Sequence, residues 1–159
     1  MKAEIVNSFI RASLDVIEQT TGLKAQLGQA YRQDTPYSSD SLVVLIGLTG
    51  DLQGSVAISL SQKTACKIAS LMMGGMPVPT LDEMGKSAIA ELCNMILGNA
   101  GILLSQLGTK INVTPPATLT GENIMLSMQN VVIICIPLLF ENSKLLELNI
   151  SYRESNQRH

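Results

Sequence analysis

The sequence predicts an α+β fold: a single domain in which two long helices pack on one face of an antiparallel sheet. Apolar residues recur with helical spacing in two long segments, Lys2 to Thr21 and Asp82 to Leu107. The strand-like segments follow one another through tight turns instead of alternating with helices, which is typical of antiparallel sheets. The opposite face of this sheet needs cover, and we expect a small helix or a second subunit to supply it.

The first half of the chain supplies one long helix, a hairpin and a short helix. The helix from Lys2 to Thr21 buries a stripe of apolar residues (Val6, Phe9, Ile10, Leu14 and Ile17), and Gly22 ends it. After it we expect, in order, an edge strand at Leu23 to Tyr31, a polar loop at Gln33 to Ser41, and strands at Leu42 to Leu48 and Ser55 to Leu60. The turn from Gly50 to Gly54 joins these two strands, and Ser61 caps a helix that runs to Met73.

The second half supplies the central helix and the remaining strands. The linker from Gly74 to Pro79 leads into the helix. The sequence then predicts a strand at Lys110 to Thr114, a break at Pro115-Pro116, a loop through Glu122, and strands at Asn123 to Ser127, Val131 to Leu139 and Leu145 to Tyr152. Turns at Gln129-Asn130 and at Glu141 to Ser143 connect the last three strands.

The central helix, Asp82 to Leu107, separates into two faces. A capping box at Thr80-x-x-Glu83 predicts its start, and Gly108 predicts its end. The apolar arc consists of Ile89, Leu92, Cys93, Ile96, Leu97, Ala100, Leu103, Leu104 and Leu107. The opposite side carries Ser87, Glu91, Asn94, Gly98, Gly101 and Ser105.

This polar face is unusual because a solvated helix face usually carries Lys and Glu. Each glycine costs about 1 kcal/mol relative to alanine inside a helix. Two interpretations are open: the glycines mark close contact with another helix or the sheet, or they leave room for another molecule to approach Asn94.

Composition and charge exclude several classes of protein. The chain of 159 residues is 46% hydrophobic and 15% charged, which is typical of a compact globular domain. The net charge of −2 without a basic cluster argues against nucleic-acid binding. No apolar run reaches the roughly 18 residues of a membrane span, and the N-terminus lacks the apolar block of a signal peptide. We therefore expect a cytoplasmic protein with no membrane span.

Cysteine and histidine chemistry is limited as well. Cys66, Cys93 and Cys135 lie far apart in apolar runs, which predicts reduced core thiols. The only histidine is His159, the last residue, so triad and Cys–His nucleophilic sites have no base. No zinc-ligand spacing is present, and we expect neither a metal site nor a cofactor of the protein's own.

Ser87-x3-Glu91-x2-Asn94, followed by Pro115-Pro116, resembles the signature of the CheC/CheX/FliY chemotaxis phosphatases. Pro116 is separated from Asn94 by 21 residues, which is within the usual spacing of that family or one residue short of it. The Gly50-to-Gly54 turn and the helix ending Leu71-Met72-Met73-Gly74 fit the same family. The similarity covers most of the chain, and its length and single full motif are most like the CheX branch. It implies one phosphatase domain at residues 1–154 with a frayed polar tail at 155–159.

The resemblance implies hydrolysis of the phospho-aspartate of a CheY-type receiver domain, which itself brings Mg²⁺ and a lysine. Asn94 would position the attacking water and Glu91 would pair with the receiver's lysine, so these two are the candidate catalytic residues. Ser87, Gly98 and Pro116 are candidates for partner contact. The resemblance also implies a homodimer paired through its sheets.

Other interpretations remain. A non-catalytic receiver-binding or flagellar-switch module would use the same fold and face, and a purely structural oligomer subunit would leave the face unexplained. Glu4 and Asn7 repeat the Glu-x2-Asn spacing in the first helix. That copy lacks a residue four positions before Glu4 and a matching proline, so a favourable first-turn acid is the simpler interpretation.

Overall fold

The computed structural model describes residues 2–127 and 132–155. The helices are α1 (Ala3–Thr21), α2 (Gln62–Met72) and α3 (Glu83–Gln106). The strands are β1 (Gln26–Leu27), β2 (Tyr31–Gln33), β3 (Tyr37–Ser38), β4 (Leu42–Gly50), β5 (Leu52–Leu60), β6 (Ile111–Val113), β7 (Ala117–Thr120), β8 (Met125–Leu126), β9 (Ile133–Phe140) and β10 (Ser143–Glu154).

The main sheet has eight strands, and every described pairing within it is antiparallel. Its order is β1-β9-β10-β5-β4-β6, with β2 also beside β9 and β7 also beside β4. β3 and β8 form a separate two-stranded ribbon. The predicted α+β class with an antiparallel sheet is therefore confirmed.

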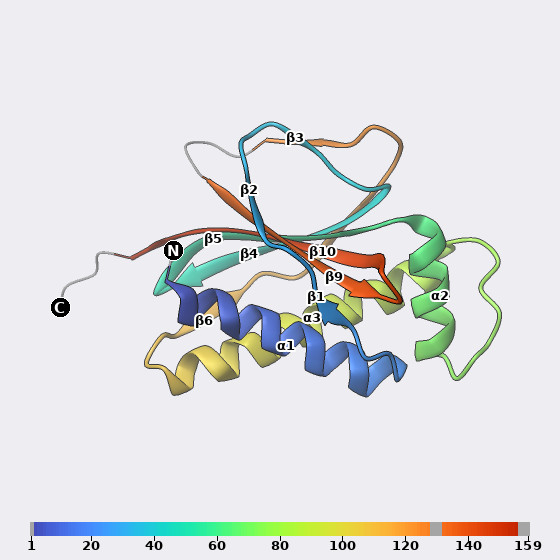
Figure 1. Cartoon of the computed structure of the whole chain (residues 1–159), viewed down its shortest axis with the longest axis horizontal. Helices are drawn as coiled ribbons and strands as arrows, with labels where there is room; N and C mark the ends of the chain where they lie inside the picture. The colour runs from blue at the N-terminus through green and yellow to red at the C-terminus, as the bar shows by residue number, and fades with distance from the viewer. Residues whose placement is uncertain (1, 128–131, 156–159) are drawn as a thin grey trace.

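The helices lie together on one face of the sheet. α1 and α3 run side by side in opposite directions below the sheet, and α2 packs at one end of the pair (Figure 1). Side chains of all three helices join the inward side chains of β4, β5, β9 and β10 in one core. One of our two expectations, that the small helix covers the opposite face of the sheet, is therefore wrong. A smaller cluster lies there instead, in which Tyr37 and Leu126 of the ribbon pack on Val43, Ala57 and Cys135 of the sheet.

The ends of the long helices show which of the predicted helix start and stop residues are correct. Gly22 and Gly108 have φ values of +77° and +83°, and both end a helix as predicted. The amide of Thr109 donates to the carbonyl of Leu104 at 2.9 Å, which completes the closing turn. At the start of α3, however, Asp82 is the N-cap and accepts from the amide of Gly85 at 2.8 Å. The predicted capping box at Thr80 is therefore wrong.

The long central strands were predicted, as were the short strands β6 and β8, whereas the other short strands were predicted poorly or not at all. β4, β5, β9 and β10 match predicted strands, with ends that shift by a few residues. The predicted edge strand at Leu23 to Tyr31 is reduced to β1 and the start of β2. β3 and β7 were predicted as loop, because two to four residues with few apolar side chains give no periodic signal. The predicted turn at Gln129-Asn130 lies outside the described residues.

Two turns set the register of the hairpins. Between β4 and β5, Gly50 has a φ of +95°, and β5 begins at Leu52, so the turn is shorter than the predicted Gly50-to-Gly54 segment. Gly54 lies inside β5, where a Cβ would collide with the backbone of Ser151 and Tyr152 in β10. The predicted turn between β9 and β10 is present. There, Glu141 and Asn142 have φ values of +51° and +62°, as a tight hairpin requires.

α3 is the central helix of the core. Its buried residues include Ile89, Leu92, Cys93, Ile96, Leu97, Ala100 and Leu104. Leu107 is 50% exposed at the end of the helix, so its place in the predicted apolar arc is wrong. By length and composition alone α3 would also pass for a membrane span, with a mean hydropathy of 1.5 over its best window. Its apolar side packs in the protein core, which is what a buried helix of a globular domain does.

The three cysteines are free, as predicted, but they differ in environment. Cys93 and Cys135 are buried, and burial raises the pKa of Cys93 to about 12. Cys66 is only partly buried, so it is not a core thiol in the same sense.

Candidate functional site

The outward face of α3 presents the predicted site residues together. Ser87, Glu91, Asn94 and Gly98 are all exposed. Glu91 and Asn94 are three residues apart, so their Cα atoms differ in height by about 4.5 Å along the helix and by about 60° around it. Within the part of the chain that the structure describes, neither side chain makes a hydrogen bond or ion pair. The result is an accessible carboxylate beside an accessible amide.

The sequence left two interpretations open for the glycines of this face, and the structure supports a different one for each glycine. A Cβ built on Gly98 meets nothing within 4 Å, so this glycine borders open space. A Cβ on Gly101 would lie 3.7 Å from Cγ1 of Ile111 in β6, which is an ordinary packing contact. The packing interpretation therefore holds for Gly101, and the open-surface interpretation holds for Gly98.

The proline segment lies beside α3 because of how the edge of the sheet is built. β6 and β7 both pair with β4, and Pro115-Pro116 interrupts them. Between the two strands, the amide of Gly47 donates to Oγ1 of Thr114 at 2.8 Å, and the amide of Thr114 donates to the carbonyl of Gly47 at 3.0 Å. A Cβ on Gly47 would lie only 2.9 Å from Cγ2 of Thr114. This Gly47–Thr114 clasp fixes the segment that leads to the half-buried Pro116.

The partial copy of the motif in α1 has a different neighbourhood. Glu4 and Asn7 are exposed, and Glu4 lies in the first turn. The residue four positions after Asn7 is Arg11, which approaches Asp15 at 3.9 Å, whereas the residue four positions after Asn94 is Gly98. A long charged side chain therefore stands where the open space lies in α3.

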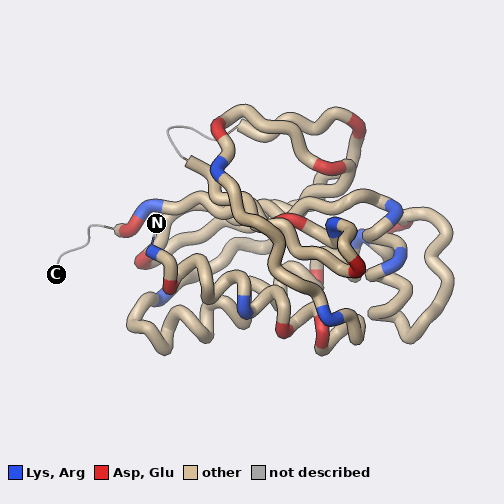
Figure 2. The backbone as a smooth tube through the Cα atoms, viewed as in Figure 1, with Lys and Arg blue, Asp and Glu red and all other residues tan. Residues whose placement is uncertain are grey.

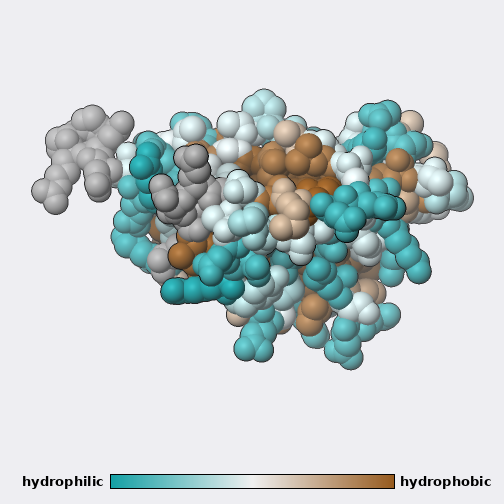
Figure 3. All heavy atoms as spheres, turned by 90° about the horizontal axis from the view of Figure 1, so that it is seen from above, coloured by the Kyte–Doolittle hydropathy of each residue, from teal (hydrophilic) through white to brown (hydrophobic). Residues whose placement is uncertain are grey.

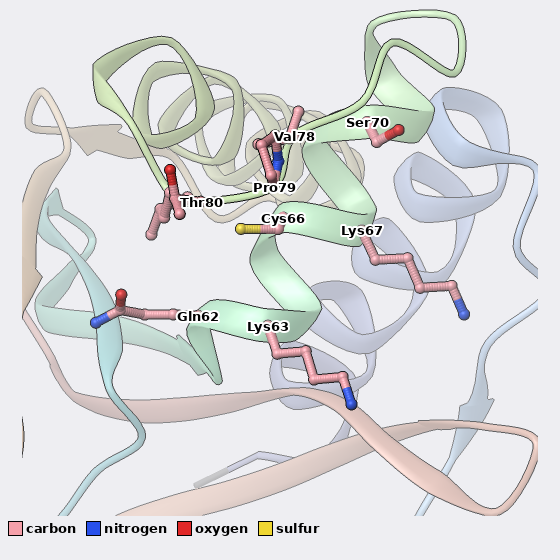
Figure 4. Close-up of a pocket in the computed structure, with 9 residues that line it drawn as sticks. Gln62, Lys63, Cys66, Lys67, Ser70, Val78, Pro79 and Thr80 are labelled. Carbon is pink, nitrogen blue, oxygen red and sulfur yellow. The ribbon is translucent and has the colours of Figure 1, made fainter.

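A pocket in the structure is separate from this face. It has a volume of about 580 Å³ and lies between α2 and the linker that precedes α3. The thiol of Cys66 points into it, while the side chains of Lys63 and Lys67 extend away from α2 (Figure 4). Ser87, Glu91 and Asn94 do not line it.

The charges on the molecule are mixed in sign, with Lys, Arg, Asp and Glu distributed over the helices and the ends of the strands (Figure 2). Among the residues the structure describes, no group of three or more His, Cys, Asp and Glu side chains is placed to hold a metal ion. Glu91 is therefore not part of such a metal-binding group among the described residues.

Two features of the face escaped the sequence analysis. The Gly47–Thr114 clasp joins residues far apart in the chain and gives no local signal. Three exposed apolar residues of α3, Met84, Met95 and Ile102, were overlooked although their spacing is visible in the sequence.

Comparisons with known proteins define the class. The fold is that of the CheC-like proteins: a CheC-like superfamily protein from Shewanella sp. PV-4 superposes with a TM-score of 0.85 at 23% identity, over 96% of this chain and 99% of the other. A family model described as chemotaxis phosphatase CheX matches residues 42–139. A CheY-P phosphatase CheX from Thermotoga maritima is 36% identical over 133 residues, which are 84% of this chain and 86% of the relative.

The chain belongs to the chemotaxis phosphatase CheX family. A further solved structure, the CheX–CheY–BeF3–Mg²⁺ complex from Borrelia burgdorferi, contains a chain with a TM-score of 0.80 and 26% identity, over 94% of this chain and 97% of that one. The resemblance noted in the sequence is thus confirmed at the level of family and fold.

The open space at Gly98 leads to a first prediction. Gly98→Gln should leave the fold intact and raise the free energy of unfolding by up to about 1 kcal/mol, because glutamine is the better helix former. The glutamine side chain should block the approach of a CheY-type receiver to Asn94. Both the binding of the receiver and its dephosphorylation should then be lost. Gly98→Ala is the matched control, since it gains helix propensity without a long side chain and should keep both. Unfolding of Gly98→Gln in thermal denaturation would mean that the glycine is a packing contact after all.

Proposed function

We propose that this protein is a phosphatase that hydrolyses the aspartyl phosphate of a CheY-type receiver domain, acting from α3 in the cytoplasm. One observation carries this: Asn94 is exposed and has no hydrogen-bond partner among the described residues, and it lies beside the open position at Gly98 in a chain of the CheX family. We assign the catalytic unit to residues 1–154. The predicted frayed tail is wrong at Ser155, whose amide donates to the carbonyl of Asp51 at 2.8 Å, and residues 156–159 lie outside the described residues. The relatives support the choice of substrate, since one is named a CheY-P phosphatase and another is solved with CheY, BeF3 and Mg²⁺.

Asn94 is the residue that we assign to the attacking water. An aspartyl phosphate is a reactive acyl phosphate, and what its hydrolysis requires is a water held in line with the phosphorus–oxygen bond that breaks. The amide oxygen of Asn94 accepts a hydrogen bond from this water, and the amide nitrogen can donate. A carboxylate in the same place would repel the phosphoryl oxygens. Water adds to phosphorus, the aspartate leaves as a carboxylate, and inorganic phosphate is released.

Glu91 is assigned to a cation of the partner, namely the lysine that a receiver holds beside its phosphoryl group. It lies about one turn before Asn94 and has no ion-pair partner within the described residues. Pairing with the receiver would satisfy this carboxylate and set the angle at which Asn94 enters the receiver's site.

The remaining predicted residues shape the approach. Ser87, about one turn before Glu91, lies at the rim of the contact, and Gly98 leaves room for the partner's backbone. Pro116 forms part of the segment beside α3 that the Gly47–Thr114 clasp holds in place. Mg²⁺, in this proposal, belongs to the receiver.

The face of the sheet opposite α1 and α3 gives the second prediction, which is a homodimer. Figure 3 views that side and shows a hydrophobic area near its centre. Leu119 of β7 and Met125 of β8, 42% and 59% exposed, belong to elements on this side. Pairing through the sheets would bury such side chains and leave the site face of α3 free. Sedimentation at micromolar concentration should give the mass of a dimer, and a monomer under those conditions would count decisively against it.

The alternative function is a receiver-binding or switch module that does not turn over. Both functions use the same face, so binding alone does not separate them. The test is to add the protein in substoichiometric amount to a phosphorylated receiver with Mg²⁺ and to follow the loss of aspartyl phosphate. An enzyme consumes many equivalents, whereas a binder leaves the receiver's own decay unchanged in all but the bound fraction.

A further inference from the structure

α3 carries a row of three exposed apolar side chains that the core does not explain. Met84, Met95 and Ile102 are 63%, 38% and 58% exposed. Met84 and Met95 are eleven residues apart, and Met95 and Ile102 are seven apart. At about 100° per residue these spacings return to the same direction within about 20°, so the three side chains form one line along the helix.

This apolar row borders the site residues. Glu91 is seven residues after Met84 and four before Met95, so it falls on nearly the same line. The row lies toward α1, because Ile102 lines a small hollow of about 110 Å³ with Ala12 and Asp15. Asn94 lies toward β6, since Gly101, two turns further on the same side, contacts Ile111.

We propose that the apolar row (Met84, Met95 and Ile102) is the hydrophobic part of the docking surface for the receiver domain. This rests on the proposed function, because it assumes that a domain seats its phosphoryl group at Asn94. The partner that fits has an apolar patch on one side of its acyl phosphate and a cation facing Glu91.

Dimensions favour this occupant. The row is about 27 Å from end to end at about 1.5 Å per residue. A globular domain of about 100 residues has a radius of gyration near 13 Å, so it is roughly 30 Å across. Such a domain, centred on Asn94, must cover Met95 and reach towards both ends of the row.

The chemistry favours it as well. Methionine is unbranched and polarizable, so two methionines adapt to a partner surface without a preformed pocket. Apolar side chains beside Glu91 also exclude water when the complex forms, which strengthens the pairing of that carboxylate with a buried cation. Central residues of an interface usually contribute most, so Met95 should matter more than Met84 or Ile102.

The test replaces each residue by glutamine, which resembles methionine in length and helix propensity. Met76→Gln is the matched control, since Met76 is also 59% exposed but lies in the linker that precedes α3, outside the apolar row. The probe is a CheY-type receiver loaded with beryllium fluoride and Mg²⁺, which binds without turning over. The dephosphorylation rate at saturating protein is measured in parallel with the Kd.

We expect Met95→Gln to raise Kd by about 3- to 20-fold, and Met84→Gln and Ile102→Gln by about 2- to 5-fold each. The saturated rate should stay near that of the wild type, and Met76→Gln should change neither quantity. If the variant that carries all three glutamines (the triple variant) binds the receiver as tightly as the wild type, the row is not the docking surface. Turnover by the wild type would in that case still support the phosphatase.

A different failure would point to a different occupant. If the triple variant lowers the mass of the protein in sedimentation without changing Kd, the row contacts a second copy of the chain, and the proposal is overturned. If the wild type binds the receiver through the row but does not accelerate dephosphorylation, the proposed function fails while the docking surface stands.

Discussion

Asn94→Ala should abolish most of the catalysis and leave the complex intact. If Asn94 orients the attacking water, its contribution is made mainly in the transition state, so kcat should fall by about 100- to 1000-fold, the range seen when one orienting or stabilising donor is removed from an active site. The Kd for a receiver loaded with beryllium fluoride and Mg²⁺ should change little. The fold should not suffer, because the side chain is exposed and makes no hydrogen bond within the described residues.

The partial motif in α1 provides the control for this variant. Asn7 is also an exposed asparagine on a long helix, three residues after a glutamate. Asn7→Ala should keep full activity, because Arg11 occupies the position that Gly98 leaves open in α3. Weaker binding by Asn94→Ala at near-normal turnover would show that the amide serves docking rather than chemistry.

Glu91→Ala should mainly weaken the binding of the receiver, in contrast to Asn94→Ala, which should mainly slow the chemical step. A pair between Glu91 and a lysine of the receiver exists before the chemical step as well as during it. Its loss should cost about 1–3 kcal/mol of binding, roughly a 5- to 150-fold rise in Kd. The dephosphorylation rate at saturation should fall less than in Asn94→Ala. Any fall would come from the loss of the Glu91–lysine pair as a contact that sets the angle of docking.

Two variants make this assignment of Glu91 specific. Glu91→Gln keeps the length and the acceptor oxygen but removes the charge, so its Kd should lie between those of the wild type and Glu91→Ala, with a weaker dependence on salt. Glu4→Ala, in the first turn of α1, should leave Kd unchanged. A normal Kd for Glu91→Ala together with a large loss of rate would reverse the roles given to Glu91 and Asn94.

The central helix illustrates how much of the site was predictable. Apolar residues at helical spacing over more than six turns predicted α3 and its buried face, and Gly108 predicted its end, since both depend on local sequence alone. The N-cap was less certain because Thr80 and Asp82 are both good capping residues. In the structure the helix begins after Asp82, whose carboxylate accepts from the amide of Gly85, three residues further on.

The glycines and the edge of the sheet mark the limit of such prediction. The same residue type borders open space at Gly98 and a side chain of β6 at Gly101, because what surrounds a Cβ position is decided by elements distant in the chain. The pairing of β3 with β8 and the clasp between Gly47 and Thr114 are equally non-local. In contrast, the exposure of Met95 and Ile102 follows from the helical period, since neither residue falls within the predicted apolar arc.

The account is tested most directly by the rate of phosphoryl loss in the saturated complex. Wild-type protein and Asn94→Ala are each added in excess to a phosphorylated CheY-type receiver with Mg²⁺, and the remaining aspartyl phosphate is measured with time. We predict rapid loss with the wild type, and with Asn94→Ala a decay much closer to that of the receiver alone, although both bind. A wild-type complex that decays no faster than the free receiver would contradict the claim that this protein is a phosphatase.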